Sequence, residues 1–294
     1  MNETARQRDT SDPSDPRAQL IRSHWDRDGY VFPIDVLNEA EAREIRSDLE
    51  DAEAAVRDDA ELTEMVRGYT NLMLPSFASL VRHPRIVEAV KPILGPDLLV
   101  WGCSMFIKEP QTRSYVSWHQ DLNYWGLDGD REVTVWVALS PATTESGCMR
   151  FVPGSHKTPD LPHTDTFARD NLLSRGQEVS VEVDDSQGVD IVLATGQASL
   201  HHGHLLHASY QNRTDDRRIG AAIRYISPDM AQTSRARTVV TLVAGEDRFG
   251  HFELAPAPTE RLSPLMVALC RDAIARKSEI LYRDAKEQGR RRVV

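Results

Sequence analysis

The feature that most constrains the fold is a series of short strand-like segments between Leu98 and Ser227. Each segment is rich in β-branched residues or alternates apolar and polar residues, and Gly, Pro or Asp separates it from the next. Several short strands at fairly regular spacing are typical of a β-sandwich, a jelly roll or a barrel. The segments are LLVWGCSMFIKE, EVTVWVAL, CMRFVPGS, EVSVEVD, VDIVLATGQASL and RIGAAIRYIS. The centre of the chain is therefore predicted to be mainly β.

Helical patterns flank this β-rich centre on both sides. Asn38 and Glu41 have the spacing of a capping box, which predicts that a long helix starts at this point. Another helix is predicted over residues 83–94, and it ends at Gly95. Helical periodicity returns after Pro264. The predicted order is therefore helices, a β-rich centre and a terminal helix.

Shifts in composition indicate one domain with additions. Residues 1–16 are polar and rich in Pro, Asp and Ser, which predicts a disordered lead-in. Residues 158–177 are polar and lack β-periodicity, so we interpret them as a long excursion from the core, with a lid as one role. The predicted single domain covers 17–294, with a helical part 17–96, a jelly-roll core of about 97–230 and a C-terminal extension 231–294.

Composition and charge narrow the classes of function. A net charge of −10 over 294 residues disfavours a nucleic-acid binder that relies on phosphate contacts. The three cysteines have no paired spacing, which disfavours a disulfide framework or a zinc knuckle and favours a reducing compartment. The N-terminal segment lacks the apolar core of a signal peptide, and no stretch approaches a membrane span. These features predict a cytoplasmic protein that acts on a small molecule, with neither nucleic acid nor membrane as a partner.

The short run SWHQDLNYW contains the first candidate metal ligands, His119 and Asp121. In an extended segment, residues i and i+2 project to the same face, so this pattern presents an imidazole beside a carboxylate. One more histidine from a distant strand would complete a set of two histidines and one carboxylate. Such a set suits Fe(II), because it occupies one face of an octahedron and leaves three positions open.

The second run, SLHHGHLLHASYQNR, contains four of the ten histidines, and its last histidine is followed eleven residues later by Arg218. With a turn between them, His207 and Arg218 would lie on adjacent antiparallel strands. Arginine can bind a carboxylate through two parallel hydrogen bonds. An acid co-substrate could then chelate the metal at one end and meet Arg218 at the other, with Arg217 as the adjacent alternative for that role.

Five blocks of this chain together resemble the phytanoyl-CoA dioxygenase (PhyH) family of Fe(II)- and 2-oxoglutarate-dependent oxygenases. The blocks are MFIKEP, WHQDLNYW, VTVWVAL, SGCMRFVPGSHK and HASYQNRTDDRR. The resemblance implies a mainly β fold with flanking helices, whose core is a double-stranded β-helix (a cupin-like jelly roll). It also implies O2-dependent hydroxylation with release of succinate and CO2.

The resemblance transfers to individual residues of this chain. It implies that the iron ligands are His119, Asp121 and His207. It implies that 2-oxoglutarate is bound by Arg218 and Ser209, with Met105 and Trp136 lining its pocket. The chain has HAS where the family usually has HGS, a difference of one methyl group. Relatives that halogenate lack the carboxylate ligand, so the presence of Asp121 implies hydroxylation or a related oxidation.

Candidate substrate residues follow from their positions near these motifs. Tyr124 and Trp125 flank the iron motif and could wall the pocket or pack beneath a loop. Arg150 could pair with an anionic substrate or face outward from its strand. His202 is the histidine of the second run expected to contact a metal ligand or the substrate.

Of the remaining histidines in that run, His201 and His204 are expected to be hydrogen-bonded or exposed, without a role in the site.

The sequence thus predicts hydroxylation of a C–H bond in a small, polar or anionic metabolite, such as an osmolyte, an organophosphonate or a natural-product intermediate. The alternative is a non-oxidative, cupin-like, metal-dependent isomerase or small-acid-binding protein. That alternative would keep the three metal ligands but would not need Arg218.

Overall fold

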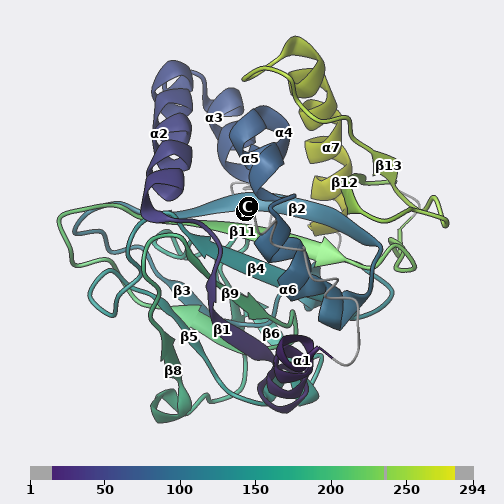
Figure 1. Cartoon of the computed structure of the whole chain (residues 1–294). Helices are drawn as coiled ribbons and strands as arrows, with labels where there is room; N and C mark the ends of the chain where they lie inside the picture. The colour runs from purple at the N-terminus through teal and green to yellow at the C-terminus, as the bar shows by residue number, and fades with distance from the viewer. Residues whose placement is uncertain (1–14, 235–236, 282–294) are drawn as a thin grey trace, which may run out of the picture.

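The computed structural model describes residues 15–234 and 237–281, and its centre is two mainly antiparallel β-sheets that face each other (Figure 1). The larger sheet has the strand order β1-β9-β4-β11-β2-β12-β13 and the smaller has the order β3-β10-β5-β8. Strands of the larger sheet are β1 (Tyr30–Asp35), β2 (Leu98–Lys108), β4 (Glu132–Ala138), β9 (Gln197–His201), β11 (Arg218–Ile226), β12 (Val239–Ala244) and β13 (Glu253–Leu254). Strands of the smaller sheet are β3 (Val116–His119), β5 (Met149–Phe151), β8 (Val189–Ile191) and β10 (His207–Ser209). This arrangement is the predicted jelly roll.

Helices cover the outer face of the larger sheet, as Figure 1 shows for α2 to α5 and α7. The helices are α1 (Pro16–Asp28), α2 (Glu39–Val56), α3 (Ala60–Gly68), α4 (Thr70–Met73), α5 (Pro75–Leu80), α6 (Pro84–Leu94) and α7 (Pro264–Leu281). The predicted capping box at the start of α2 is confirmed: the Asn38 side chain accepts from the Glu41 amide at 2.9 Å, and the Glu41 carboxylate accepts from the Asn38 amide at 2.7 Å. The predicted helices over 83–94 and after Pro264 are present as α6 and α7.

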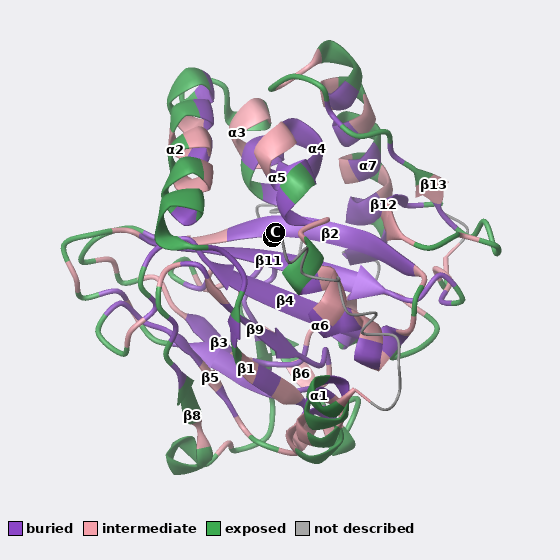
Figure 2. Ribbon diagram, in the orientation of Figure 1, coloured by how far each residue is buried: buried purple, intermediate pink, exposed green. Residues whose placement is uncertain are grey.

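The larger sheet is buried on both faces, which Figure 2 shows as continuous burial along β2, β4 and β11. Along β11, Ile219, Ala221 and Ile223 pack into the core under the helices. The alternate residues Arg218 and Arg224 line a cavity between the two sheets. Because successive strand residues point to opposite faces, one strand supplies both the core and the cavity.

Two segments differ from the sequence expectation. The excursion at 158–177 contains a strand, β6 (His163–Asp165), which pairs with β7 (Gln177–Val179) as a separate hairpin. Of the predicted strand EVSVEVD, only the first two residues, Glu178 and Val179, lie in a strand, β7. Of the predicted disordered lead-in, residues 1–14 lie outside the described residues, and α1 begins at Pro16.

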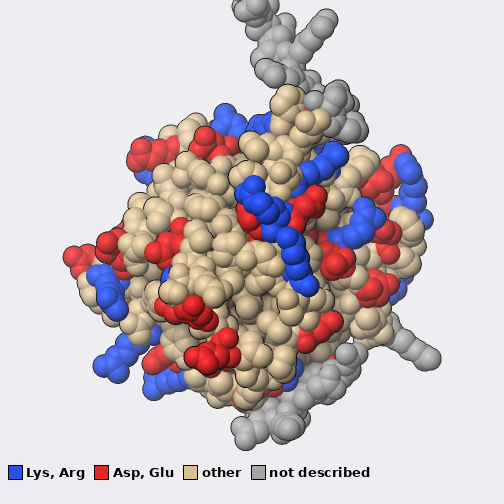
Figure 3. Space-filling view, turned by 90° about the horizontal axis from the view of Figure 1, so that it is seen from below, with Lys and Arg blue, Asp and Glu red and all other residues tan. Residues whose placement is uncertain are grey.

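The surface of the described residues is mixed in charge. On the face drawn in Figure 3, Lys and Arg side chains are interspersed with Asp and Glu. Within residues 15–234 and 237–281, no helix has both the length and the apolar content needed to cross a bilayer.

Candidate active site

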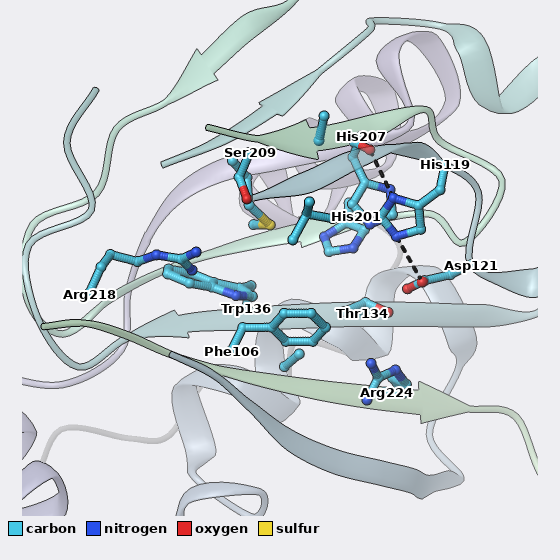
Figure 4. Close-up of a pocket in the computed structure, with 14 residues that line it drawn as sticks. Phe106, His119, Asp121, Thr134, Trp136, His201, His207, Ser209, Arg218 and Arg224 are labelled. Atoms are coloured by element: carbon cyan, nitrogen blue, oxygen red, sulfur yellow. Dashed lines mark hydrogen bonds and ion pairs between the residues drawn. The ribbon is translucent and has the colours of Figure 1, made fainter. Parts of the chain in front are cut away.

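Three candidate metal ligands meet at one end of the cavity (Figure 4). Ligand atoms of His119, Asp121 and His207 all lie within 4.8 Å of one another. His119 is the last residue of β3 and His207 the first of β10, and the two residues are direct partners across the smaller sheet. Strand pairing therefore brings together histidines that are far apart in the sequence.

Asp121 reaches this cluster through a turn, whereas the sequence predicted a continuous strand. β3 ends at His119, and Asp121 has φ −77° and ψ −48° at the start of a 3₁₀ turn over Leu122–Tyr124. The Asp121 amide donates to the carbonyl of Gly203 at 2.7 Å, which fixes this turn against the histidine run. Oδ1 of Asp121 lies 3.4 Å from Nε2 of His119. The carboxylate is therefore beside the imidazole, as predicted, but for a different local reason.

Backbone carbonyls fix the tautomers of both histidines. Nδ1 of His119 lies 2.9 Å from the Ser117 carbonyl and 3.0 Å from the His207 carbonyl, and Nδ1 of His207 lies 2.9 Å from the Leu205 carbonyl. A carbonyl can only accept, so Nδ1 carries the proton in each ring. Nε2 of each ring is then left with a free lone pair, as a metal ligand requires.

The charge states also fit a divalent metal. Burial, with a smaller contribution from His119, holds the pKa of His207 well below its usual range, so the ring is neutral at pH 7. Burial opposes ionisation of Asp121, but the contact with the His119 ring and the proximity of His207 outweigh it and lower the pKa of Asp121. Two imidazoles and one carboxylate are the donor set that suits Fe(II) with open coordination positions.

Arg218 lies at the opposite end of the cavity from the triad (Figure 4). Its side chain is 1% exposed, and its Nε and Nη2 have no hydrogen-bond partner among the described residues. The guanidinium lies 5.2 Å from the centre of the Trp136 ring. Burial lowers the pKa of Arg218 to about 10, so it remains charged at pH 7. A buried, charged group without a partner costs free energy, which indicates that an anionic ligand binds here.

Arg217, the sequence alternative for this role, points elsewhere. It forms ion pairs with Glu50 at 3.2 Å, Glu53 at 2.9 Å and Glu109 at 3.1 Å. These contacts attach the start of β11 to helix α2. The structure therefore places Arg218 in the cavity and Arg217 in an ion-pair network on the helical side.

Lys108 lies behind the Arg218 end of the cavity, in contact with Ser209, and the sequence patterns did not single it out. It is the direct partner of Arg218 across β2 and β11 and is fully buried. Its Nζ donates to Ser209 Oγ at 2.7 Å and to the carbonyl of Tyr210. Burial and the proximity of Arg218 lower the pKa of Lys108 to about 5. Ser209 lines the cavity, so its hydroxyl connects Lys108 to the space in front of Arg218.

Trp136 lines the cavity as expected, but Met105 does not. Met105 packs in the core between the larger sheet and the helices, and its neighbour Phe106 lines the cavity instead. Strand alternation is the reason, because Phe106 and Met105 face opposite sides of β2. Phe106 pairs with Gly220 of β11, where a Cβ atom would collide with the Trp136 ring. The absence of a side chain at Gly220 therefore makes room for the indole beside Arg218.

The histidine run contributes differently from the prediction. His201 is 2% exposed and lines the cavity, with its ring centre 4.8 Å from that of His207. His202 lies outside the cavity lining and packs against Trp25 and His156, with ring centres 5.5 Å apart in both cases. His201 ends β9 and pairs with Thr134, another cavity residue, so strand alternation along β9 was the signal that could have identified it.

The other candidate substrate residues are also outside the cavity lining. Arg150 forms ion pairs with Asp185 at 2.7 Å and Asp190 at 2.9 Å, as expected for its outward-facing alternative. Tyr124 packs beside His163 with ring centres 5.4 Å apart. Trp125 is buried and stacks on another tryptophan.

The jelly roll, the triad and the cationic end of the cavity together fit the class of 2-oxoglutarate-dependent dioxygenases, in which the triad would hold Fe(II) and 2-oxoglutarate and O2 would be co-substrates. Comparison with known proteins agrees with this class. The sequence profile of the family described as phytanoyl-CoA dioxygenase (PhyH) matches residues 25–220, which include the triad and Arg218. The match covers more than half of the chain, and the chain therefore belongs to this family.

Individual relatives support the same assignment. The chain is 29% identical over 175 residues to a probable alpha-ketoglutarate-dependent hypophosphite dioxygenase of Stutzerimonas stutzeri, covering 58% of this chain and 60% of that protein. It is 27% identical over 179 residues to the peroxisomal phytanoyl-CoA dioxygenase of Rattus norvegicus, covering 57% of this chain and 52% of that protein. The matched part thus spans less than two thirds of these curated relatives.

Solved structures match over more of the chain. The apo form of ThoJ, described as a non-heme monooxygenase, has a TM-score of 0.81 at 33% identity, with 90% of this chain and 98% of that chain covered. CytC3 with Fe(II) and alpha-ketoglutarate has a TM-score of 0.61 at 21% identity, with 82% and 93% covered. The second similarity shows the shared fold alone.

Proposed function

We propose that this chain hydroxylates a C–H bond of a small, polar or anionic metabolite and converts 2-oxoglutarate and O2 into succinate and CO2. The proposed substrate types are an osmolyte, an organophosphonate or a natural-product intermediate. The proposed compartment is a reducing cytoplasm, which the three buried free cysteines support. The main supporting observation is a single cavity with the metal triad at one end and the unpartnered Arg218 at the other.

The two ends of this cavity match the two ends of 2-oxoglutarate. The triad leaves metal positions open for the 2-oxo and neighbouring carboxylate oxygens. Arg218 offers Nε and Nη2 to the distal carboxylate, and both are donors without a partner among the described residues. Ser209 and Lys108 add a hydroxyl and an amine at the same end. The ligand would therefore satisfy groups that the protein alone leaves unsatisfied.

Bound Fe(II) supplies the activation of O2 that couples oxidative decarboxylation of 2-oxoglutarate to C–H oxidation. The residues of the chain hold and orient the reactants. The carbonyls of Ser117, Leu205 and His207 fix the ligand imidazoles, so the donor set is preorganised. Phe106 and Trp136 form apolar walls between the two ends and exclude water from that space.

The names of two relatives support oxidation of a small molecule. One is described as a non-heme monooxygenase and is 33% identical to this chain. Another is named for hypophosphite, an oxyanion, and is 29% identical over the matched part. These names support an oxygenase that accepts a polar or anionic substrate.

A metal-dependent isomerase of the cupin type would also use the triad. It would not need a buried guanidinium with free donors at the far end of the same cavity. Arg218 therefore favours the oxygenase.

The test is turnover of 2-oxoglutarate by the full chain. Protein with Fe(II) in air is expected to form succinate, and omission of Fe(II) or O2 should abolish it. His207→Ala should also abolish it, while His251→Ala, which changes an exposed histidine, serves as the matched control. Candidate metabolites are then scored by a mass gain of one oxygen atom. An absence of both succinate formation and 2-oxoglutarate binding would contradict the proposal.

A further inference from the structure

A second buried arginine lines the cavity at the triad end. Arg224 lies on β11, six residues after Arg218 and on the same face of the strand. Figure 4 shows it near Asp121, across the cavity from Arg218. If Arg218 binds 2-oxoglutarate, the role of Arg224 is still unassigned.

Arg224 has no carboxylate partner among the described residues. It is 4% exposed, its Nη1 donates to Ser104 Oγ at 2.7 Å, and its Nε has no partner. No ion pair joins it to Asp121 or to the fully buried Glu132 within this part of the chain. Glu132 instead accepts a hydrogen bond from the amide of Gly203. The guanidinium is thus buried with unused donor capacity.

A second basic side chain, Lys277 of helix α7, lies beside Arg224. Lys277 is 6% exposed and, within the described ranges, its Nζ makes no hydrogen bond or ion pair. Both groups approach Gly102 of β2: a Cβ atom there would lie 3.2 Å from Lys277 Nζ and 3.9 Å from Arg224 Nη1. A side chain at position 102 would therefore crowd both basic groups, and Gly102 avoids this.

Two stacked tryptophans hold this pair in place. The rings of Trp101 and Trp125 are stacked with centres 5.0 Å apart. Lys277 Nζ lies 3.6 Å from the centre of Trp101, and the Arg224 guanidinium lies 5.4 Å from the centre of Trp125. Ring faces attract cations, but they do not cancel the repulsion between two of them. Burial and Arg224 accordingly hold the pKa of Lys277 well below its usual range.

We infer that Arg224 and Lys277 form the binding site for an oxyanion group, carboxylate or phosphonate, of the primary substrate. This inference rests on the proposed function and narrows its substrate class to small organic anions. The two arginines lie at opposite ends of one cavity, so each can bind a different acid. Arg218 binds 2-oxoglutarate, and Arg224 binds the primary substrate. An oxyanion between Arg224 and Lys277 would lie on the Asp121 side, so the attached carbon chain would be near the metal.

The test measures anion binding directly and does not depend on turnover. Acetate and methylphosphonate are titrated into the full chain loaded with Mn(II) and 2-oxoglutarate, and tryptophan fluorescence is recorded. Because Trp101 and Trp125 contact the two cations, a saturable change is expected. Arg224→Met and Lys277→Met should each raise the Kd of the preferred anion by at least about tenfold, the effect of one charged hydrogen bond.

Matched control variants distinguish the loss of a positive charge at this site from a general effect of substitution on the protein. Arg276→Met changes the preceding residue of α7, which pairs with Glu253 and Asp272 at the surface, and should leave anion affinity unchanged. Arg224→Lys retains the charge and should bind the anion more tightly than Arg224→Met. If one methionine variant does not fold, the other provides the comparison.

The outcomes also separate this inference from the proposed function. Comparing the two anions identifies the preferred oxyanion, and neutral amides of the same size should not bind. Absence of saturable binding to the wild-type chain would overturn the inference, as would equal affinity in wild type and both methionine variants. Normal succinate formation alongside either result would leave the proposed function intact. Loss of 2-oxoglutarate binding by the wild-type chain would instead contradict the proposed function.

Discussion

Replacing Arg218 with methionine is expected to abolish tight binding of 2-oxoglutarate. Two donors of Arg218, Nε and Nη2, have no partner among the described residues and can meet the distal carboxylate, and the residue is buried. Each hydrogen bond to a charged group is worth about 1.5–3 kcal/mol. The pair therefore contributes at least about 3 kcal/mol, which is roughly a 150-fold increase in Kd on substitution.

The assay is titration calorimetry of 2-oxoglutarate into protein loaded with Mn(II), which binds the ligand without turnover. Arg217→Met is the matched control, because Arg217 is the next residue and is paired with Glu50, Glu53 and Glu109 outside the cavity. Its affinity should equal that of wild type. Thermal unfolding without ligand adds a second readout, since Arg218→Met removes an unpaired buried charge and should not lower the midpoint. Unchanged affinity in Arg218→Met, or an equal loss in both variants, would refute the assignment.

Three further predictions follow from the cavity. Burial and Arg218 lower the pKa of Lys108 to about 5, so Lys108 is mostly neutral at pH 7, and a bound carboxylate will raise that pKa. Binding of 2-oxoglutarate should therefore take up protons at pH 7, and its affinity should fall as pH rises. Calorimetry in buffers of different ionisation enthalpy measures this proton uptake, and uptake that persists in Lys108→Met would contradict the prediction. Asp121→Ala should weaken Co(II) binding by at least about 100-fold in a metal titration, and unchanged affinity would place the metal elsewhere. Gly220→Ala should lower the free energy of unfolding by about 1–3 kcal/mol in urea, because its Cβ meets the Trp136 ring, whereas Gly129→Ala, with its nearest atom 3.9 Å away, should not.

The sequence predicted those elements whose boundaries depend on residues close together in the chain. The capping box at Asn38 and Glu41 fixed the start of α2, because both of its hydrogen bonds form within one turn. The short, turn-bounded strands predicted a mainly β centre that could be a sandwich, a jelly roll or a barrel, and the family resemblance selected the jelly roll among them. His207 and Arg218 line one cavity, as expected, but they lie on β10 and β11 in opposite sheets and not on adjacent antiparallel strands as predicted.

Side-chain direction was predictable only where strands are regular. Met105 was placed at the cavity by the family resemblance alone, and it lies on the opposite face of β2, whose pairing with β11 shifts between Arg224 and Tyr225. Between His201 and His207 the chain leaves one sheet and enters the other, so strand alternation does not carry across that turn. The expectation that His202 rather than His201 contributes to the site was wrong, because His201 is the one that lines the cavity.

The partners of the buried cations depend on tertiary packing. Lys108 lies beside Arg218 because β2 pairs with β11. Lys277 lies near Arg224 because helix α7 packs close to the same part of β11. No motif in the sequence connects these residues. The burial of Arg218 and Arg224 and their donors without a partner among the described residues are visible only in the folded chain. These two arginines mark the two ends of the cavity.

Turnover in isotopically labelled O2 tests the central claim most directly. In the proposed reaction, one atom of O2 enters succinate and the other enters the product. The full chain with Fe(II) and 2-oxoglutarate should release succinate that contains one labelled oxygen atom, and His119→Ala should release none. Failure of the wild-type chain to form succinate, or succinate without the label, would contradict the account.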